Sequence, residues 1–271
     1  MVVRTLLRYP GGKVKAIKFI KPIMQSIPHS EYREPFVGGG SVFMSKDPVK
    51  SNWINDIDKD LIALYKILSH KKQREELIKD LLNVTISREL YDELYYSKPK
   101  DMYGKAKRFY ILNRTSFSGI TKWNAFIGDV RYNVKNAQDY MRMMGERLSK
   151  YKITSWDFER IISEKSNESP FLFLDPPYSE SRQIAAYTHA FFKDDHIRLA
   201  KLLKKTNYPF LLTYDNTEFI QDLYDWAYQK PYTWTYSIAN SKVHHNPREA
   251  GNELFIANFD IKKEVQMILM N

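Results

Sequence analysis

The residues with the clearest chemical potential are the consecutive Asp175-Pro176-Pro177-Tyr178. They follow an unbroken apolar run over residues 171–174, which predicts a buried strand. Because proline fixes φ, the two prolines hold the Asp175 carboxylate and the Pro176 carbonyl in place. Both groups accept hydrogen bonds and suit an exocyclic amino group with two N–H donors, while the Tyr178 ring offers a flat face to the same planar base. The alternative is a plain turn that ends the strand.

A glycine-rich turn is the second candidate site. It consists of Glu34-Pro35-Phe36-Val37-Gly38-Gly39-Gly40-Ser41, between a predicted short strand and a predicted helix. Glycines in such a place let a ligand approach the backbone at a helix N-terminus. The turn does not match Gly-x-Gly-x-x-Gly and no Gly-Lys-Ser/Thr follows, which disfavours P-loop chemistry. A simple tight turn is the alternative interpretation.

Asp56 is the third candidate, because it ends the next predicted strand. An acidic residue in this position accepts hydrogen bonds from ribose hydroxyls in nucleoside-binding α/β folds. The alternative is a helix N-cap, since Asp56 and Asp58 both precede a predicted helix. Together with the glycine turn, Asp56 predicts an adenosine-containing ligand in a crevice at the strand ends.

The elements that must position these residues alternate between strand and helix, which favours an α/β fold with a mostly parallel sheet. Strands are expected at 31–36, 51–55, 152–155, 170–174, 209–213, 233–238 and 253–259. Helices are expected at 13–27, 58–68, 136–148, 194–205 and 218–226, with a mostly helical stretch at 71–115 and a loop or hairpin at 117–133. Residues 61–150 interrupt the alternation, which predicts an inserted module within a domain formed by residues 1–60 and 151–271.

The positive charge of the chain is concentrated in two segments. The net charge is +10, yet residues 1–30 carry six Lys and Arg and no acidic residue, and residues 98–152 carry thirteen against four. Such basic segments suggest a polyanion as partner, whereas a solvated basic face is the alternative. Aromatic residues alternate with the cations of the second segment, and flat rings can stack on bases or wedge between them. These rings are Tyr103, Phe109, Tyr110, Phe117, Trp123, Phe126, Tyr132 and Tyr140.

Composition excludes several classes of protein. The 271 residues contain no cysteine, which excludes disulfides, thiolate metal sites, iron–sulfur clusters and a thiol nucleophile. The sequence contains no run of about 18 apolar residues, so no transmembrane helix is expected. The N-terminus lacks the apolar region of a secretory signal. We therefore expect a cytoplasmic protein without a membrane partner and without a metal site.

The motifs occur in the order of the Dam-type, α-group (D12 class) DNA adenine-N6 methyltransferases, and the chain resembles that family over nearly its whole length. The Asp175–Tyr178 motif and the glycine turn are joined in this resemblance by Arg8-Tyr9-Pro10-Gly11-Gly12-Lys13 near the N-terminus. Asn55-Asp56-Ile57 and the segment from Asn113 to Ile120 are also similar to the family. The resemblance implies a Rossmann-like domain that binds S-adenosylmethionine, with a mostly helical inserted target-recognition domain.

The resemblance also implies site residues for the cofactor. Expected around it are Tyr9, Gly11, Gly12, Lys13, the turn from Glu34 to Ser41, Asp56 at the ribose, Asp157 and Phe158 near the adenine, and Asp175. Asp175 has a double place, beside both the methionine end of the cofactor and the target amino group. Together with Pro176, Pro177 and Tyr178 it forms the expected catalytic motif.

DNA contact is expected at residues of both basic segments. The expected set is Arg8, Arg114, Phe117, Ser118, Ile120, Lys122, Trp123, Asn124 and Arg131. Lys122 stands where the family often has a base-reading arginine. Lysine is a point charge whereas arginine offers guanine a bidentate fork, so the GATC target common in the family is not carried over to this chain.

The expected reaction moves a methyl group from S-adenosylmethionine to N6 of an adenine that is flipped out of a short, palindromic site in double-stranded DNA. Tyr187, Thr188 and His189 are candidates for contact with the flipped base, the alternative being a surface histidine. Other interpretations are methylation of cytosine N4, RNA or protein, and a catalytically silent DNA-binding module. Enzymes that methylate glutamine side chains, and many that methylate RNA, usually have Asn in place of Asp175. Enzymes that methylate cytosine N4 more often have Ser there. A cognate restriction endonuclease is a candidate partner. We expect a monomer, with a dimer as the alternative. The gene is expected to be bacterial, archaeal or phage-encoded.

Overall fold

The computed structural model describes residues 5–9, 11–121, 124–178, 191–234 and 251–261. Within these ranges seven strands form one sheet in the order β3-β2-β1-β4-β5-β7-β6. Their bounds are Glu31–Glu34 (β1), Ser51–Asn55 (β2), Lys152–Thr154 (β3), Pro170–Leu174 (β4), Phe210–Asp215 (β5), Tyr228–Trp234 (β6) and Gly251–Ala257 (β7). The first five strands of the order are parallel, whereas β7 runs antiparallel to both β5 and β6.

The helices of the described chain are α1 (Ile17–Ser26), α2 (Ser41–Ser45), α3 (Lys59–Ser69), α4 (Lys71–Leu82), α5 (Arg88–Tyr96), α6 (Met102–Thr115), α7 (Val134–Leu148), α8 (Phe158–Ser163), α9 (Lys193–Lys205) and α10 (Glu218–Leu223), with 3₁₀ turns η1 (Lys13–Lys15) and η2 (Phe117–Gly119). They alternate with the strands except for α3 to α7, which follow one another between β2 and β3. Side-chain N-caps begin several of them, for example Asp58 on α3, Ser87 on α5 and Asp101 on α6. None of the helices in these ranges is long and apolar enough to cross a membrane.

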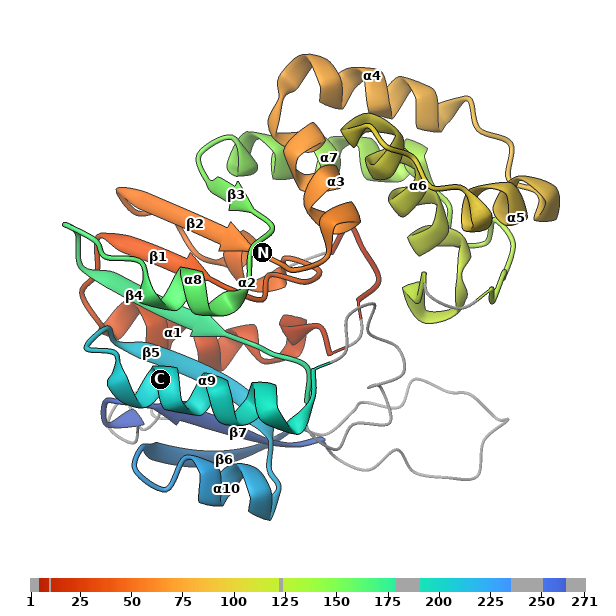
Figure 1. Ribbon diagram of the computed structural model, residues 1–271. Helices are drawn as coiled ribbons and strands as arrows, with labels where there is room; N and C mark the ends of the chain where they lie inside the picture. The colour runs from red at the N-terminus through yellow and green to blue at the C-terminus, as the bar shows by residue number, and fades with distance from the viewer. Residues whose placement is uncertain (1–4, 10, 122–123, 179–190, 235–250, 262–271) are drawn as a thin grey trace.

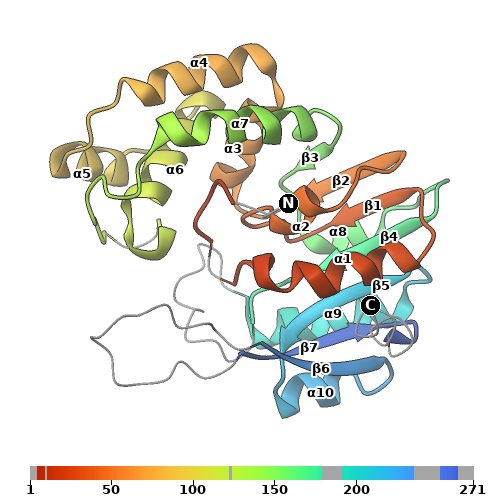
Figure 2. The same ribbon diagram turned by 180° about the vertical axis from the view of Figure 1, so that it is seen from behind.

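Both faces of the sheet are covered, by α8 and α9 on one face and by α1 on the other (Figures 1 and 2). Strand β4 shows why its sequence is apolar throughout. Leu172 and Leu174 pack with the α8–α9 side, whereas Phe171 and Phe173 pack with the α1 side. A strand that is buried on both faces has no polar alternation, as the unbroken run at 171–174 predicts.

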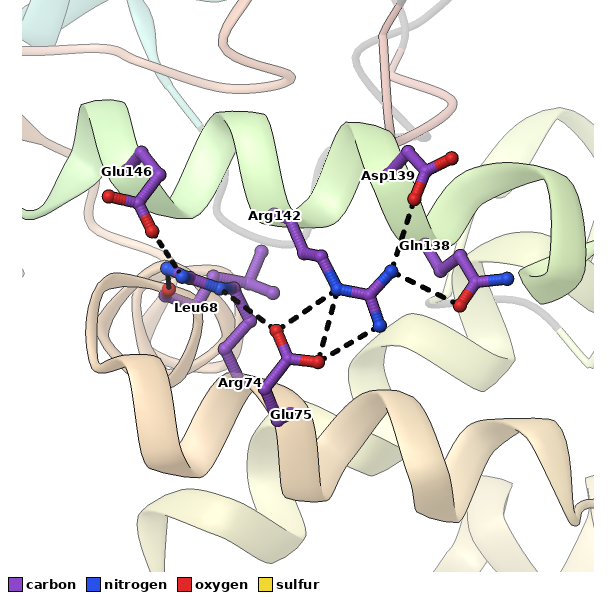
Figure 3. Close-up of polar contacts among 7 residues, drawn as sticks. All are labelled: Leu68, Arg74, Glu75, Gln138, Asp139, Arg142 and Glu146. Carbon is purple, nitrogen blue, oxygen red and sulfur yellow. Dashed lines mark hydrogen bonds and ion pairs between the residues drawn. The ribbon is translucent and has the colours of Figure 1, made fainter.

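Helices α3 to α7 gather to one side of the sheet in both views (Figures 1 and 2). Their apolar faces share one buried cluster with α1 and with the α1 side of the sheet. A polar network also joins α4 to α7, as Figure 3 shows. In it Arg74 donates to Glu146 and to the Leu68 carbonyl, and Arg142 donates to Glu75. The predicted loop at 117–133 contains η2, and its Phe126 forms an antiparallel bridge with Ser116, the residue before the loop.

Several predicted elements differ from the structure. The helix predicted at 13–27 is the 3₁₀ turn η1 followed by α1, and the strand predicted at 31–36 ends at Glu34. The strand predicted at 233–238 is β6, which begins at Tyr228 and overlaps the prediction only at 233–234; residues 235–238 lie outside the described residues. The pattern did not predict a strand over Gln229-Lys230-Pro231, because lysine and proline are rare in strand interiors. β6 is an edge strand, where both residues are tolerated. The predicted helix at 218–226 ends at Leu223.

Candidate active site

The candidate site is a cavity of about 340 Å³ at the carboxyl ends of the parallel strands. Every residue of the predicted cofactor set except Gly40 lines this cavity, as do Asp175, Pro177 and Tyr178 of the catalytic motif. Pro176 is buried beside them. The volume lies within the range of small-molecule sites. Strand order reverses between β1 and β4, and the crevice at such a reversal is where open α/β sheets bind ligands.

Asn55 fastens the strand ends that form the floor of the cavity. Its side-chain amide donates to the Pro35 and Trp156 carbonyls at 3.0 and 2.9 Å. Its amide oxygen accepts from the Trp156 N–H and the Thr154 hydroxyl, both at 2.8 Å. A single buried side chain therefore ties the segments that follow β1 and β3 to the end of β2.

The glycine turn is in close contact with Tyr9. A Cβ added to Gly39 would stand 2.9 Å from the Tyr9 Cβ, and one added to Gly38 would stand 3.1 Å from the Tyr9 ring. Gly38 and Gly40 have φ of +45° and +76°, a region that favours glycine. Tyr65 also donates to the Gly38 carbonyl at 2.6 Å. The turn thus needs its glycines both for its backbone conformation and for the ring that lies against it.

Asp56 is buried and organises the turn rather than capping a helix. Its carboxylate accepts from the Gly38 N–H at 2.9 Å and from the Asp58 N–H at 3.0 Å. Asp58 is the residue that caps α3. Burial raises the pKa of Asp56 to about 7, although the N–H donors oppose this effect.

A second buried acid, Glu34, faces the same cavity. Tyr32 donates to its carboxylate at 2.5 Å. Burial, together with the charges of Asp175 and Asp56, raises its pKa well above the usual range. Among the described residues, six carboxylates line the cavity, including Glu34, Asp56 and Asp175, against two cations. Of the two, Lys13 pairs with Asp175, and Arg198 pairs with Asp157 and Asp195. Such a site suits a ligand that carries positive charge.

Asp175 is fixed by two neighbours at the end of β4. Its Oδ1 lies 2.8 Å from the Lys13 ammonium and accepts from the Thr213 hydroxyl of β5 at 2.7 Å. Lys13 is almost completely buried and also donates to the Gly11 carbonyl at 2.8 Å. No described residue donates a hydrogen bond to Oδ2 of Asp175, so this oxygen is available to a ligand in the cavity.

Tyr178 has its ring against Lys13 and its hydroxyl against the sheet. The Lys13 ammonium lies 4.7 Å from the ring centroid. The hydroxyl donates to Glu253 of β7 at 2.6 Å, and burial raises the pKa of Tyr178 well above its usual value. The contacts to Lys13 and Glu253 therefore hold the ring in one orientation.

The adenine end of the predicted cofactor site is aromatic. Phe36, Phe158 and Phe191 have ring centroids 5.4 to 5.8 Å apart and all line the cavity. Asp157 caps α8 and receives two hydrogen bonds from Arg198 of α9, both of 2.9 Å. Burial would raise the pKa of Asp157, but Arg198 and the Glu159 N–H lower it below the usual value.

A second cavity, of about 460 Å³, adjoins the first and shares Tyr9, Gly12, Gly39 and Ser41 with it. It brings together four members of the predicted DNA set, Arg8, Arg114, Ser118 and Ile120. Burial and the charges of Arg131 and Arg114 lower the pKa of Arg8. No described carboxylate lies within ion-pair distance of these three arginines. An unneutralised cationic cluster of this kind favours an anionic ligand.

The other predicted DNA residues have different surroundings. Phe117 is 59% exposed at η2, whereas Phe109 and Tyr110 are buried, so part of the basic aromatic stretch is core. The Asn124 side chain is engaged with Arg88 and Asp92 of α5. Lys122, Trp123, Tyr187, Thr188 and His189 lie outside the described residues.

Several residues of the site were not found from the sequence. Phe191, Phe192, Asp195 and Arg198 line the first cavity from α9 and the segment before it. Thr213, Tyr232 and Glu253 form the support behind the Asp175–Tyr178 motif. The one available signal was Glu253, a charged residue at the start of the apolar run Leu254-Phe255-Ile256-Ala257.

An open sheet with a glycine turn and an acidic cavity at its point of reversal defines an α/β protein that binds a nucleoside-containing ligand. The family model of the D12 class N6 adenine-specific DNA methyltransferases matches residues 9–238. The chain belongs to this family. Its members use S-adenosylmethionine as methyl donor and DNA as substrate, and the expected enzyme class and fold are thereby confirmed.

Individual relatives agree with the family. The Type II methyltransferase M.CviBI of Paramecium bursaria Chlorella virus NC1A is 28% identical over 267 residues, which cover 96% of this chain and 99% of that protein. The Type II methyltransferase M.MjaIII of Methanocaldococcus jannaschii is 29% identical over 243 residues, covering 76% and 81%. The DNA adenine methylase of Escherichia coli (strain K12) is 24% identical over 257 residues, covering 83% and 85%.

Proposed function

We propose that this chain methylates N6 of an adenine that is flipped out of a short duplex site into the corner formed by Asp175, Pro176 and Tyr178. The observation that carries the proposal is that Asp175, whose Oδ2 accepts no hydrogen bond from a described residue, lines the same cavity as the glycine turn and Tyr9. An extruded base has to reach the methyl donor, because the amino group is inaccessible inside the duplex. Asp175 and the Pro176 carbonyl would each accept a hydrogen bond from the N6 amino group, and the Tyr178 ring would stack on the purine.

The cavity fits S-adenosylmethionine by its charges and its shape. Asp56 is set to accept from the ribose hydroxyls, and the Phe36 and Phe158 rings suit the adenine. The acidic lining suits the sulfonium and ammonium charges, while Lys13 suits the carboxylate. Glycines at the turn let the Tyr9 side chain lie directly against the backbone at the cavity wall, where a side chain on the turn would displace it. When bound, this ligand supplies an electrophilic methyl group.

The residues of this chain contribute by positioning and electrostatics. Methyl transfer would form an N6–C bond as the S–C bond of the donor breaks, with the electron pair of that bond left on sulfur. The proton that N6 releases would pass to Asp175 or to water. Hydrogen bonds from N6 to Asp175 and to the Pro176 carbonyl direct the nitrogen lone pair towards the methyl group and raise its electron density. Asp175 also stabilises the positive charge that develops on N6. Neither role requires a covalent enzyme intermediate, in keeping with the absence of cysteine.

We infer that residues 61–150, which include most of α3 and all of α4 to α7, are the target-recognition module. Arg8, Arg114 and Arg131 would contact phosphates, and the exposed Phe117 ring would wedge beside the flipped nucleotide. Lys122, Trp123 and Asn124 belong to the loop that would read bases. A monomer suffices for one flipped base. A DNA substrate supports a cytoplasmic enzyme encoded by a bacterial, archaeal or phage genome, and the Type II names of some relatives make a cognate restriction endonuclease a candidate partner.

The test is transfer of tritiated methyl groups to genomic DNA that is free of N6-methyladenine. Asp175→Ala is expected to abolish transfer while DNA binding persists, whereas Asp222→Ala, an exposed carboxylate on α10, is expected to act like the unaltered chain. Labelled N6-methyladenine made by Asp175→Ala would refute the catalytic assignment. Single-molecule sequencing of DNA from expressing cells would give the modified atom and the site, and a modified cytosine would refute the adenine assignment.

A further inference from the structure

A carboxylate on β7 lies directly behind the Asp175–Tyr178 motif. Glu253 is 8% exposed and pairs in register with Asp215 of β5 and Tyr232 of β6. Its Oε2 accepts from the Tyr178 hydroxyl at 2.6 Å and from the Tyr232 hydroxyl at 3.0 Å. The same oxygen lies 3.9 Å from the Lys13 ammonium. One oxygen therefore faces three groups of the site.

The position of Glu253 is unfavourable for a residue that only completes the sheet. A buried carboxylate is costly unless it is paired and hydrogen-bonded, and an apolar side chain would continue the run that follows it. Burial raises the pKa of Glu253, and so does the charge of Asp175, whereas Lys13 and the two phenols lower it. Among the described residues, the contacts that offset the cost of its charge come from Tyr178 and Lys13 of the cavity and from Tyr232 of β6.

Tyr232 and Lys13, which both contact Glu253, are themselves held by other side chains. Tyr232 stacks on Phe255 with ring centroids 3.8 Å apart and planes 1° apart. Lys13 lies between Asp175 and Glu253, at 2.8 and 3.9 Å, so one ammonium is held between two carboxylates. A change at Glu253 would therefore act on both the Tyr178 ring and the cation that orients Asp175.

We propose that Glu253 is a positioning residue for methyl transfer, which fixes the Tyr178 ring through its hydroxyl and shares Lys13 with Asp175. This inference rests on the proposed function, in which Tyr178 stacks on the flipped adenine. Without Glu253, the ring turns about its side-chain bonds, and Lys13 pairs with Asp175 alone. The acceptor base is then bound in a range of orientations, only a fraction of which lie in line with the methyl group.

The first experiment compares Glu253→Gln with Glu218→Gln, a control at an exposed glutamate on α10. The single-turnover rate of tritiated methyl transfer to adenine in unmethylated genomic DNA is measured, together with the Kd for S-adenosylmethionine. Glu253→Gln is expected to slow transfer about tenfold, the loss typical of one charge-assisted hydrogen bond, with a Kd within about threefold of the unaltered chain. Glu218→Gln is expected to change neither quantity.

The second experiment distinguishes positioning from mere support of the sheet. Tyr178→Phe keeps the ring and removes only the hydroxyl that Glu253 accepts. If Glu253 acts through this hydroxyl, the rate losses of Glu253→Gln and Tyr178→Phe are less than additive in the double variant. Fully additive losses, or an unchanged rate in Glu253→Gln, would overturn the inference. Tyr178→Phe also carries the test if Glu253→Gln does not fold, since a rate equal to that of the unaltered chain would overturn it as well.

Failure of this inference is separable from failure of the proposed function. If the unaltered chain makes N6-methyladenine and Asp175→Ala does not, an unaffected Glu253→Gln variant overturns the role of Glu253 alone. If the labelled product is not N6-methyladenine, the proposed function falls whatever the glutamine variant does.

Discussion

The side chain of Asn113 forms hydrogen bonds with both the N–H and the carbonyl of Arg8. Its amide oxygen accepts from the Arg8 N–H at 3.0 Å, and its amide nitrogen donates to the Arg8 carbonyl at 2.8 Å. The same nitrogen donates to the Gly119 carbonyl at 3.1 Å, and a Cβ on Gly119 would overlap the Arg8 carbonyl oxygen. The next residue, Tyr9, lies on the glycine turn. A continuous chain of contacts thus links the predicted DNA turn to the predicted cofactor turn.

Asn113→Ala is expected to break this link. The Arg8 backbone groups are part-buried and would lose their partners, which lowers the free energy of unfolding by about 2–3 kcal/mol. DNA and S-adenosylmethionine are expected to bind cooperatively in the unaltered chain, because each orders one end of the linked segment. The variant is expected to lose most of this cooperativity. Measurement of DNA affinity by fluorescence anisotropy, with and without S-adenosylhomocysteine, gives the coupling.

The alternative outcome is informative for this prediction. Equal cooperativity in Asn113→Ala and in the unaltered chain would show that the two ligands communicate by another route. Asn136→Ala serves as the control, because Asn136 is an exposed asparagine on α7 whose side chain makes no hydrogen bond with the described residues 5–9.

Much of the fold could be predicted from the sequence because its signals are local. The apolar run at 171–174, the caps of the helices and the alternation of elements all depend on neighbours in the chain. The position of β6 could not be predicted, since its Lys230 and Pro231 are acceptable only at a sheet edge. Which strand lies at an edge depends on the strand order, which the pattern does not contain.

The site shows the same division. The Asp175–Tyr178 motif and the glycine turn are contiguous and could be recognised, and the structure brings them into one cavity. Their supports, Thr213, Arg198 and Glu253, come from strands and helices that are distant in sequence. Each is an ordinary polar residue of its own element, and only the folded arrangement shows what it contacts. The aromatic residues around 103–140 illustrate the limit, because their pattern alone did not separate core from surface.

Binding of S-adenosylmethionine is expected to tighten about tenfold between pH 6 and pH 8, because Asp56 must lose its proton before ribose hydroxyls donate to it. Burial raises the pKa of Asp56 from 3.8 to about 7. The folded state therefore binds this proton more tightly than the unfolded state. The raised pKa of Asp56 therefore adds to the free energy of unfolding of the ligand-free protein. This contribution is fully present below about pH 4 and is lost as the pH rises through about 7.

Isothermal titration at a series of pH values measures this dependence. Asp56→Asn is expected to bind more weakly and with a flatter pH profile. An unchanged slope in the variant would assign the titration to a different group, of which buried Glu34 is the nearest candidate.

Gly145→Ala is expected to destabilise the α4–α7 contact that Figure 3 shows. A Cβ at this position would overlap both the Arg74 guanidinium and the Leu68 carbonyl, which are themselves hydrogen-bonded at 3.0 Å. Since both neighbours are buried and rigid, the loss in unfolding free energy is expected to reach at least about 2 kcal/mol. Glu75→Gln, which removes a partly exposed ion pair in the same network, is expected to cost under about 1 kcal/mol. Urea unfolding of both variants checks this order, and equal losses would contradict it.

Arg8→Ala is expected to weaken DNA binding more than Arg114→Ala does. The guanidinium of Arg8 has no described hydrogen-bond acceptor, whereas Arg114 donates to the Arg131 carbonyl at 3.0 and 2.7 Å. Arg8 is therefore free to contact phosphate, while the fork of Arg114 is partly occupied. Loss of one phosphate contact reduces the slope of log K against log salt by about 0.9.

Filter binding of duplex DNA over a series of salt concentrations measures the slopes. Lys165→Ala is the matched control, because Lys165 is exposed just before β4, at the amino end of a strand whose carboxyl end carries the site. Its slope is expected to equal that of the unaltered chain. If Arg8→Ala and Lys165→Ala gave the same slope, the second cavity would not be part of the DNA surface, and the positive charge around it would have to serve another anion.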